Sequence, residues 1–158
     1  MRVFLKELQD TQTVERVGVV TFNEGTYLTQ DLTSDYKSLM DSLTAITPSG
    51  ATAIGDGITS GVSVYQNSPN HRPWAARVMI VLTDGQSNTG SDPIVAATAA
   101  AAQGMTIHAV SFTTYGSDTT MRQIADIGGG RFEDAADIAA LKKSFLEIVR
   151  TIPVLLIE

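Results

Sequence analysis

Three apolar runs rich in β-branched residues constrain the fold most strongly. They cover Arg16–Asn23, Arg77–Thr83 and Met105–Phe112, and they are nearly continuous rather than alternating. Such a run is typical of a strand that is covered on both faces, as in a parallel sheet. Segments with helical spacing separate the runs. The pattern therefore predicts an α/β, doubly wound, mostly parallel sheet with helices on both faces.

One strand of this sheet is predicted to be antiparallel. The segment Thr26–Gln30 follows the first run after Glu24 and Gly25, which is the arrangement of a hairpin and its edge strand. The first two predicted helices are Asp35–Ile46, with a cap at Thr33 or Ser34, and Ile54–Gln66. The next runs from Pro93 to Gly104 and is capped by Ser91 or Asp92. The last two run from Ser117 or Asp118 to the glycines 128–130, which end the helix, and from Asp137 to about Arg150. No linker or repeat interrupts the chain, so residues 1–158 are expected to form a single domain.

Composition excludes several classes of partner and chemistry. Seventeen acidic against eleven basic residues give a net charge of −6, which opposes binding to DNA, RNA or anionic lipid. The absence of cysteine excludes disulfides, thiol catalysis and cysteine-ligated metals. No apolar run approaches the ~20 residues that a helix needs to cross a bilayer. Neither nucleic-acid binding nor direct membrane insertion is therefore expected.

Two loops carry the chemistry that is most informative about function. In an open α/β sheet, ligands bind beyond the carboxyl ends of the strands. The loops Pro48–Gly57 and Thr83–Gly90 are expected there, and they combine hydroxyl groups and glycines with the carboxylate of Asp84. An oxygen-rich rim of this kind suits a hard cation such as Mg²⁺. The alternative is that both loops only supply turns and helix caps.

Five strings of the sequence together resemble a known family. They are RVGVVTFN, LTSD at Leu32–Asp35, GATAIGDGI at Gly50–Ile58, VMIVLTDGQSN at Val78–Asn88 and IADIGGGRFEDA at Ile124–Ala135. In order and approximate spacing, over nearly the whole chain, they resemble a bacterial von Willebrand factor A domain. The resemblance implies a Rossmann-like sheet with one antiparallel edge strand. It also implies a module that binds partner proteins and catalyses no reaction.

The resemblance implies a metal-ion-dependent adhesion site as well. Thr52 and Asp84 match two of the family's ligands for Mg²⁺ or another divalent cation. A cation with neutral hydroxyl ligands is under-neutralised, so an acidic residue of a protein partner is expected to complete its coordination. The surrounding contact rim is then predicted to consist of Ser49, Gly50, Gln86, Ser87 and Asn88.

The sequence departs from the family pattern at one point. The family's metal site begins with D-x-S-x-S after its first strand, and this sequence has no such string; Asp31–Asp35 is the nearest match but follows the hairpin arm. Met1–Leu8 resembles the later part of the family's first helix. The first strand is therefore expected to be missing, and Thr52 and Asp84 alone supply too few ligands for tight Mg²⁺ binding.

A missing central strand leaves backbone groups of its two neighbours unpaired, which is costly when they are buried. We predict that the apolar segment Val154–Ile157 fills this position, in the same chain or by strand exchange in a dimer, with Glu158 approaching Asp84. The alternative is an edge strand or a lead into a further domain.

Enzymatic motifs are incomplete. Gly50–Gly55 has the glycine spacing of a phosphate loop, but Asp56 stands where the lysine is required. Gly57–Gly61 has threonine where a nucleophile elbow needs serine. His71 is expected to be solvated and His108 to be a core residue, so no catalytic base is evident.

These observations favour a protein-binding module that works through the rim loops. The alternative is a metal-free structural subunit of an envelope or pilus-type assembly, and an enzyme with a Rossmann-like core comes third. Similar bacterial domains occur in the cell envelope, so an extracytoplasmic location is an expectation from resemblance.

Overall fold

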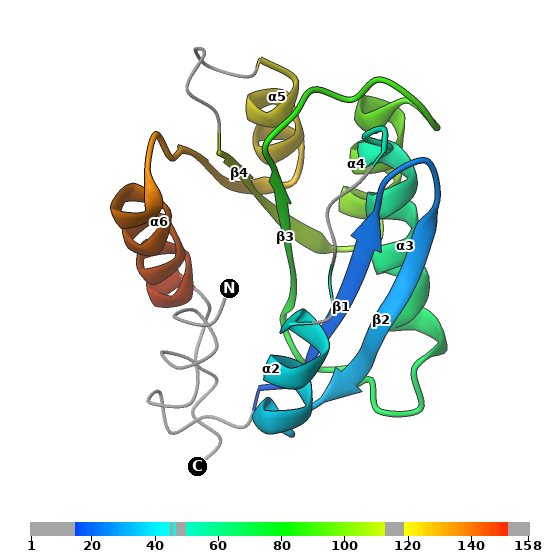
Figure 1. The fold of residues 1–158 in the computed structure, drawn as a ribbon. Coiled ribbons are helices and arrows are strands. Elements are labelled where there is room, and N and C mark those ends of the chain that lie inside the picture. The colour runs from blue at the N-terminus through cyan, green and yellow to red at the C-terminus, as the bar shows by residue number, and fades with distance from the viewer. Residues whose placement is uncertain (1–14, 45, 47–49, 113–118, 152–158) are drawn as a thin grey trace.

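The computed structural model describes residues 15–44, 46, 50–112 and 119–151 (Figure 1). The tail segment Val154–Ile157 and the residues before Glu15 lie outside the described residues. The elements, in chain order, are β1 (Val17–Phe22), β2 (Thr26–Thr33), α2 (Tyr36–Thr44), α3 (Ile54–Asn67), β3 (Arg77–Thr83), α4 (Pro93–Ala101), β4 (Met105–Ser111), α5 (Thr119–Ile127), β5 (Gly129–Asp134) and α6 (Ile138–Thr151).

The strands form the predicted α/β arrangement. β3, β4 and β5 pair in that order and are parallel, and β1 pairs with β2 as an antiparallel hairpin. The β3–β4 register runs without a shift from Arg77 opposite Met105 to Thr83 opposite Ser111. Among the described residues, β1 and β3 do not pair with each other, so the sheet is divided into two parts.

Burial differs sharply between the two apolar strands β3 and β4. Six of the seven residues of β4 are buried, whereas Val81 and Thr83 are the buried residues of β3. β4 has a hydrogen-bonded neighbour on each side, but β3 has one on a single side in the described part of the chain. Within the described residues, the continuous apolar sequence of β3 therefore lies at an edge of its three-stranded sheet.

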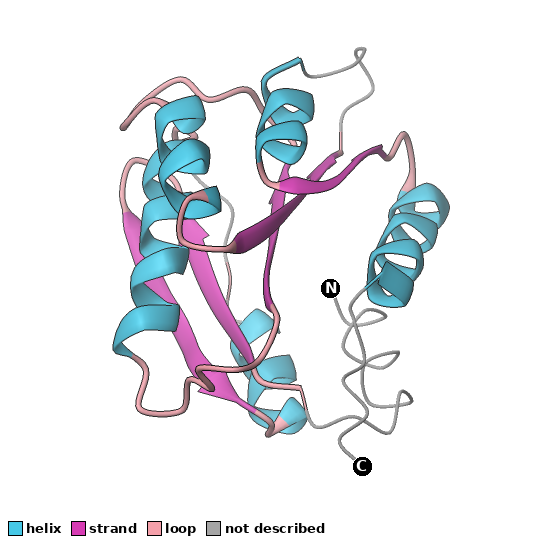
Figure 2. Ribbon diagram, turned by 180° about the vertical axis from the view of Figure 1, so that it is seen from behind, coloured by secondary structure: helices cyan, strands magenta, loops and turns pink. Residues whose placement is uncertain are grey.

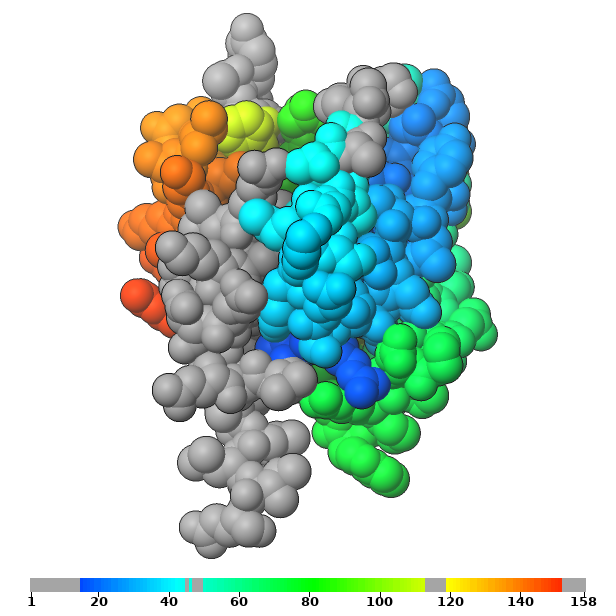
Figure 3. Space-filling model, turned by 60° about the horizontal axis from the view of Figure 1, so that its bottom comes forward, coloured from blue at the N-terminus to red at the C-terminus, as the bar shows by residue number. Residues whose placement is uncertain are grey.

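The helices form two layers. α3, α4 and α5 pack together on one side of the strands, around Ile58, Ala97 and Ile124 (Figure 2). On the other side, α6 contributes Phe145 to a cluster with residues of β1 and α2, and α2 lies against the β1–β2 hairpin (Figure 3). None of the described helices has the length and hydropathy of a membrane span.

The helix caps follow the sequence in two of the three helices where a predicted cap can be compared. The Asp92 carboxylate accepts hydrogen bonds from the amides of Ile94 and Val95, with Pro93 as the first helical residue of α4. Asp137 accepts from Ala140 at the start of α6.

The predicted cap at Thr33 or Ser34 is wrong. The Asp35 carboxylate accepts from the amides of Lys37 and Ser38 at the start of α2. Asp35 directly precedes the first helical residue, and the Thr33 hydroxyl accepts from the Asp35 amide instead.

β5 is a strand that the sequence analysis missed. The glycines 128–130 were expected only to end a helix; α5 does end at Ile127, but β5 begins at Gly129. Gly129 has a left-handed backbone with φ of 64°. A Cβ atom at Gly130 would lie 2.1 Å from the carbonyl oxygen of Ile107, so this glycine lets β5 approach β4 closely.

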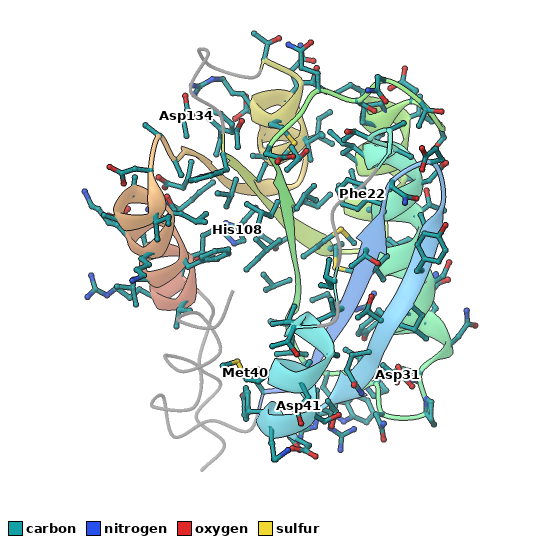
Figure 4. The ribbon with its side chains drawn as sticks, viewed as in Figure 1. Phe22, Asp31, Met40, Asp41, His108 and Asp134 are labelled. Atoms are coloured by element: carbon teal, nitrogen blue, oxygen red, sulfur yellow. The ribbon has the colours of Figure 1, made fainter. Side chains whose placement is uncertain are left out.

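His108 is a core residue, as expected. Its side chain, on the side of the sheet that faces α6, is 4% exposed, and its Nδ1 accepts a hydrogen bond of 3.0 Å from the amide of Arg131 (Figure 4). Burial, and secondarily the charge of Arg131, lowers the pKa of His108 below 6.5. The folded state thus favours neutral His108 with its proton on Nε2.

This linkage predicts a pH-dependent stability. Below about pH 6.5 the unfolded chain takes up a proton at His108 that the folded chain resists, so the free energy of unfolding falls as pH decreases. His108→Asn removes this titration, and the difference in stability between wild type and variant should narrow from pH 7 to pH 5 in urea denaturation. A constant difference between wild type and His108→Asn would contradict the prediction.

Candidate functional site

Three loops meet at the carboxyl ends of β1 and β3, at the upper end of the molecule in Figure 1. They are the hairpin turn Asn23–Gly25, the segment that leads into α3, and the loop that follows β3. The amide of Ala53 donates to the carbonyl of Asn23 over 3.0 Å, which joins the first loop to the second. We call this end the rim.

Thr52 is held by the loop after β3. Its amide donates to Oδ1 of Asn88 over 2.8 Å, and its carbonyl accepts from the amide of Asn88 over 3.1 Å. The Ser87 hydroxyl donates to the same carbonyl over 3.3 Å. Residues that are 36 positions apart in sequence are thereby fixed side by side.

The Thr52 side chain faces the first residues of that loop. A Cβ atom built on Gly85 would lie 3.4 Å from the Thr52 hydroxyl, and Asp84 is the residue before Gly85. The turn itself is held by Thr83, whose hydroxyl accepts from the Gly85 amide over 3.1 Å and donates to the Gly85 carbonyl over 2.9 Å. The hydroxyl of Thr52 therefore lies beside the segment that carries Asp84.

The carboxylate of Asp84 is available for a ligand. The residue is exposed, and the described part of the chain offers its side chain no hydrogen bond or ion pair. Thr52 is half-buried, and its hydroxyl group has no hydrogen bond to the described residues, because the hydrogen bonds of this residue use its main chain.

A second carboxylate lies at the rim, and the sequence analysis missed it. Glu24 projects from the hairpin turn toward Gly50, where a Cβ atom would lie 2.2 Å from the Glu24 carboxylate. Gly50 has φ of 82°, a conformation that favours glycine. The position of Glu24 at the carboxyl end of a strand was the signal that could have identified it.

Asp56 fastens the far end of the loop after β3. Its Oδ1 accepts from the Ser91 hydroxyl over 2.6 Å and from the Ser91 amide over 3.0 Å. These hydrogen bonds lower the pKa of Asp56, because they favour the charged carboxylate. Asp56, which stands where a phosphate loop requires lysine, thus holds the end of the loop after β3 against α3.

The predicted contact residues have different surroundings. Gly50, Gln86 and Asn88 are exposed, Ser87 is half-buried, and Ser49 lies outside the described residues. Ser87 and Asn88 hold the backbone of Thr52, so their side chains have a structural task at the rim. A role of any of these residues in binding a partner stays a prediction.

The oxygen atoms of Asp84 and Thr52 are of the type that binds a divalent cation, but two ligands are too few to complete its coordination. Asp84 and Thr52 offer a carboxylate and a hydroxyl, which are the ligand types of Mg²⁺. Within the described ranges there is no group of three His, Cys, Asp or Glu residues that could hold a metal ion. Water or a partner would have to supply the remaining ligands.

Comparison of the sequence with known protein families tests the resemblance to the von Willebrand factor A domain. The sequence profile of the von Willebrand factor type A domain matches residues 1–147. The chain belongs to the von Willebrand factor type A (VWA) domain family. VWA domains are generally protein-interaction modules without enzymatic activity. None of the curated proteins compared with the chain matches it.

Solved structures share the fold of this VWA domain. The conserved hypothetical protein BatB from Bacteroides thetaiotaomicron is 20% identical, with a TM-score of 0.74, and the match covers 96% of this chain and 85% of BatB. A von Willebrand factor type A protein from Catenulispora acidiphila is 24% identical, with a TM-score of 0.73 over 92% of this chain and 35% of that one.

A third structural relative contains a metal. Proximal thread matrix protein 1 from the mussel byssus, with a zinc-occupied MIDAS motif, is 24% identical, with a TM-score of 0.74 over 94% of this chain and 41% of that one. Divalent-cation binding thus occurs within this fold.

Proposed function

We propose that this VWA domain binds a partner protein at the rim and that Thr52 and Asp84 ligate a divalent cation there. The observation that carries the proposal is the clamp between Asn88 and Thr52, which fixes the Thr52 hydroxyl beside the segment of Asp84. The family supports a binding function, and the zinc-occupied relative supports a cation.

The chemistry of the rim supports a partner that carries an acidic side chain. Asp84 neutralises only part of the charge of a divalent cation, and the Thr52 hydroxyl neutralises none. A bound cation with open positions attracts a further anionic oxygen, and a Glu or Asp of the partner supplies one. Mg²⁺ is the proposed ion because both ligands are hard oxygen donors.

Isothermal titration of the full chain with Mg²⁺ and Mn²⁺ tests the proposal. We expect weak binding by wild type and at least ~10-fold weaker binding by Asp84→Asn, since ligand charge sets affinity at such sites. Asp126→Asn is the matched control, because it removes an exposed carboxylate on α5, away from the rim. Equal binding by all three proteins would overturn the assignment of Asp84.

A metal-free structural subunit is the second candidate function. The lack of a clustered ligand set favours it, because within the described residues no three His, Cys, Asp or Glu side chains lie together so that they could hold a metal ion. This candidate predicts no heat from either cation with wild type or Asp84→Asn. The same titration therefore separates the two functions.

A further inference from the structure

The outer side of β2 is an exposed edge of the sheet (Figure 1). Within the described residues, β2 pairs with β1 on one side and with no strand on the other. From Thr26 to Gln30 it has neither a charged residue nor a proline, which commonly protect edge strands. Tyr27 and Leu28 are 58% and 59% exposed. This edge is therefore suited to contact another chain.

A groove of about 310 Å³ runs beside this edge, between β2 and α3. Val64 and Leu28 give it an apolar part. The other residues with which α3 lines the groove are Ser60, Ser63 and Asn67, whose side chains are polar. These side chains leave Leu28 largely uncovered. The groove thus offers a place for an apolar side chain of another molecule.

Two hydrogen bonds hold β2 at the two ends of the groove. At the upper end, the Ser60 hydroxyl donates to the Thr26 hydroxyl over 2.8 Å. At the lower end, the side-chain amide of Asn70 donates to the carbonyl of Leu32 over 2.9 Å. An edge strand directs every second pair of backbone N–H and C=O groups outward, so the stretch of β2 between these two points presents such groups to a ligand.

An irregularity in β2 places Asp31 in the groove. Side chains of a regular strand alternate between its faces, so residues 28 and 31 would lie on opposite faces. The register with β1 instead leaves Thr29 without a residue opposite it. As a result, Leu28 and Asp31 both line the groove. Re-aiming a side chain is a known effect of such bulges. Figure 4 shows Asp31 at the lower end of β2.

Asp31 makes this end of the groove negative. It is the only charged residue among the described residues that line the groove. Its Oδ1 accepts a hydrogen bond of 2.7 Å from the amide of Leu32, which orients the side chain. No ion pair with another described residue neutralises it. The groove therefore fits a cationic group near Asp31 and an apolar group near Leu28.

We propose that a basic, extended segment of a partner protein lies in this groove, antiparallel to β2. A Lys or Arg of the segment pairs with Asp31, and an apolar side chain packs on Leu28 and Val64. Backbone hydrogen bonds to the free edge of β2 add to the affinity, as in other cases where a peptide extends a sheet. The antiparallel direction is chosen because antiparallel pairs are slightly more stable. This surface is separate from the rim loops and needs no cation.

The charge of the chain argues against a second copy of it as the occupant. From Glu24 to Asp35 the sequence has no basic residue, and Asp31 is acidic as well. The β2 strand of a second copy would therefore bring only acidic side chains toward Asp31. The net charge of −6 on each copy adds a repulsion at longer range.

Titration of the full chain with a peptide, followed by amide NMR in the presence of EDTA, tests the proposal. The probe is Ac-Thr-Lys-Thr-Val-Thr-Val-Thr-NH2. Its lysine and valines share one face, and antiparallel docking brings the lysine to the end of β2 that carries Asp31. In the matched peptide, glutamate replaces the lysine. We expect the lysine peptide to shift the β2 amides and to bind at least ~5-fold more tightly than the glutamate peptide, because the cross-strand charges are opposite.

Variants assign this binding to the groove. Asp31→Asn should remove the difference between the two peptides. Leu28→Ser should weaken binding of both by at least ~5-fold, because an apolar contact is lost. Leu28 is exposed, so this variant should fold. Val95→Ser is the matched control, because it also removes an exposed apolar side chain, on α4, and it should bind as wild type does.

Three results would overturn the proposal. The first is that the lysine peptide shifts no β2 amides, or shifts amides elsewhere more strongly. The second is equal affinity of wild type for the two peptides. The third is a dimer of wild type in sedimentation that Leu28→Ser abolishes, which would assign the edge to a second copy. Because EDTA removes divalent cations, failure here is distinguishable from failure of the proposed function.

Discussion

Gly55→Ala is expected to lower the free energy of unfolding by about 3 kcal/mol, the cost of a severe overpacking. A Cβ atom at Gly55 would lie 2.2 Å from the carbonyl oxygen and 2.8 Å from the carbonyl carbon of Ser91. These are backbone atoms of the loop after β3, so relief requires the loop to move. Alanine is the better helix former by ~1 kcal/mol, so propensity alone predicts the opposite sign.

Gly61→Ala is the matched control, because it is also a glycine of α3. Its nearest obstacle is the terminal methyl group of Met79, at 2.8 Å, which can turn away. We expect its stability to lie within about 1 kcal/mol of wild type in urea denaturation. Equal stability of the two variants would mean that the loop after β3 does not rest on α3.

Phe145→Ala is expected to cost about 3–5 kcal/mol, the usual range for removing a buried aromatic ring. Phe145 is 1% exposed and packs in one cluster with Val19 of β1 and Leu39 of α2. The cluster joins α6 to the part of the sheet that β1 and β2 form. Its loss should therefore destabilise the whole domain, and chemical denaturation measures the change.

Ile138→Ala on the same helix provides the comparison. Ile138 is 66% exposed, so its truncation should change stability by no more than about 0.5 kcal/mol. A cost for Phe145→Ala as small as that of Ile138→Ala would contradict the described packing of α6.

The sequence predicts those strands that consist of long apolar, β-branched runs. Arg77–Thr83 matches β3 and Met105–Phe112 matches β4 to within one residue, because long β-branched runs have few other uses. β5 has the sequence GGRFED, whose glycines and charges lower its strand propensity. It is a strand because Gly128 and Gly130 let it lie against Ile107, and no local pattern encodes that contact.

The rim was predictable in position but not in detail. The rule that ligand loops follow the carboxyl ends of parallel strands places Thr52 and Asp84 at one end of the sheet. The Asn88 clamp on Thr52 and the Asp56–Ser91 pair join residues 35 or 36 positions apart. Such pairs depend on how the loops meet in space, so the contact of Asp56 with Ser91 and the position of Glu24 at the rim were not predicted.

Paramagnetic broadening by Mn²⁺ in the amide NMR spectrum of the full chain tests the central claim most directly. If the loops before α3 and after β3 form one cation-binding rim, the amides of Thr52 and Gly85 should broaden first and together, and Asp84→Asn should abolish the effect. Broadening that begins elsewhere, for example around Glu133 and Asp134, or that survives in Asp84→Asn, would contradict the account.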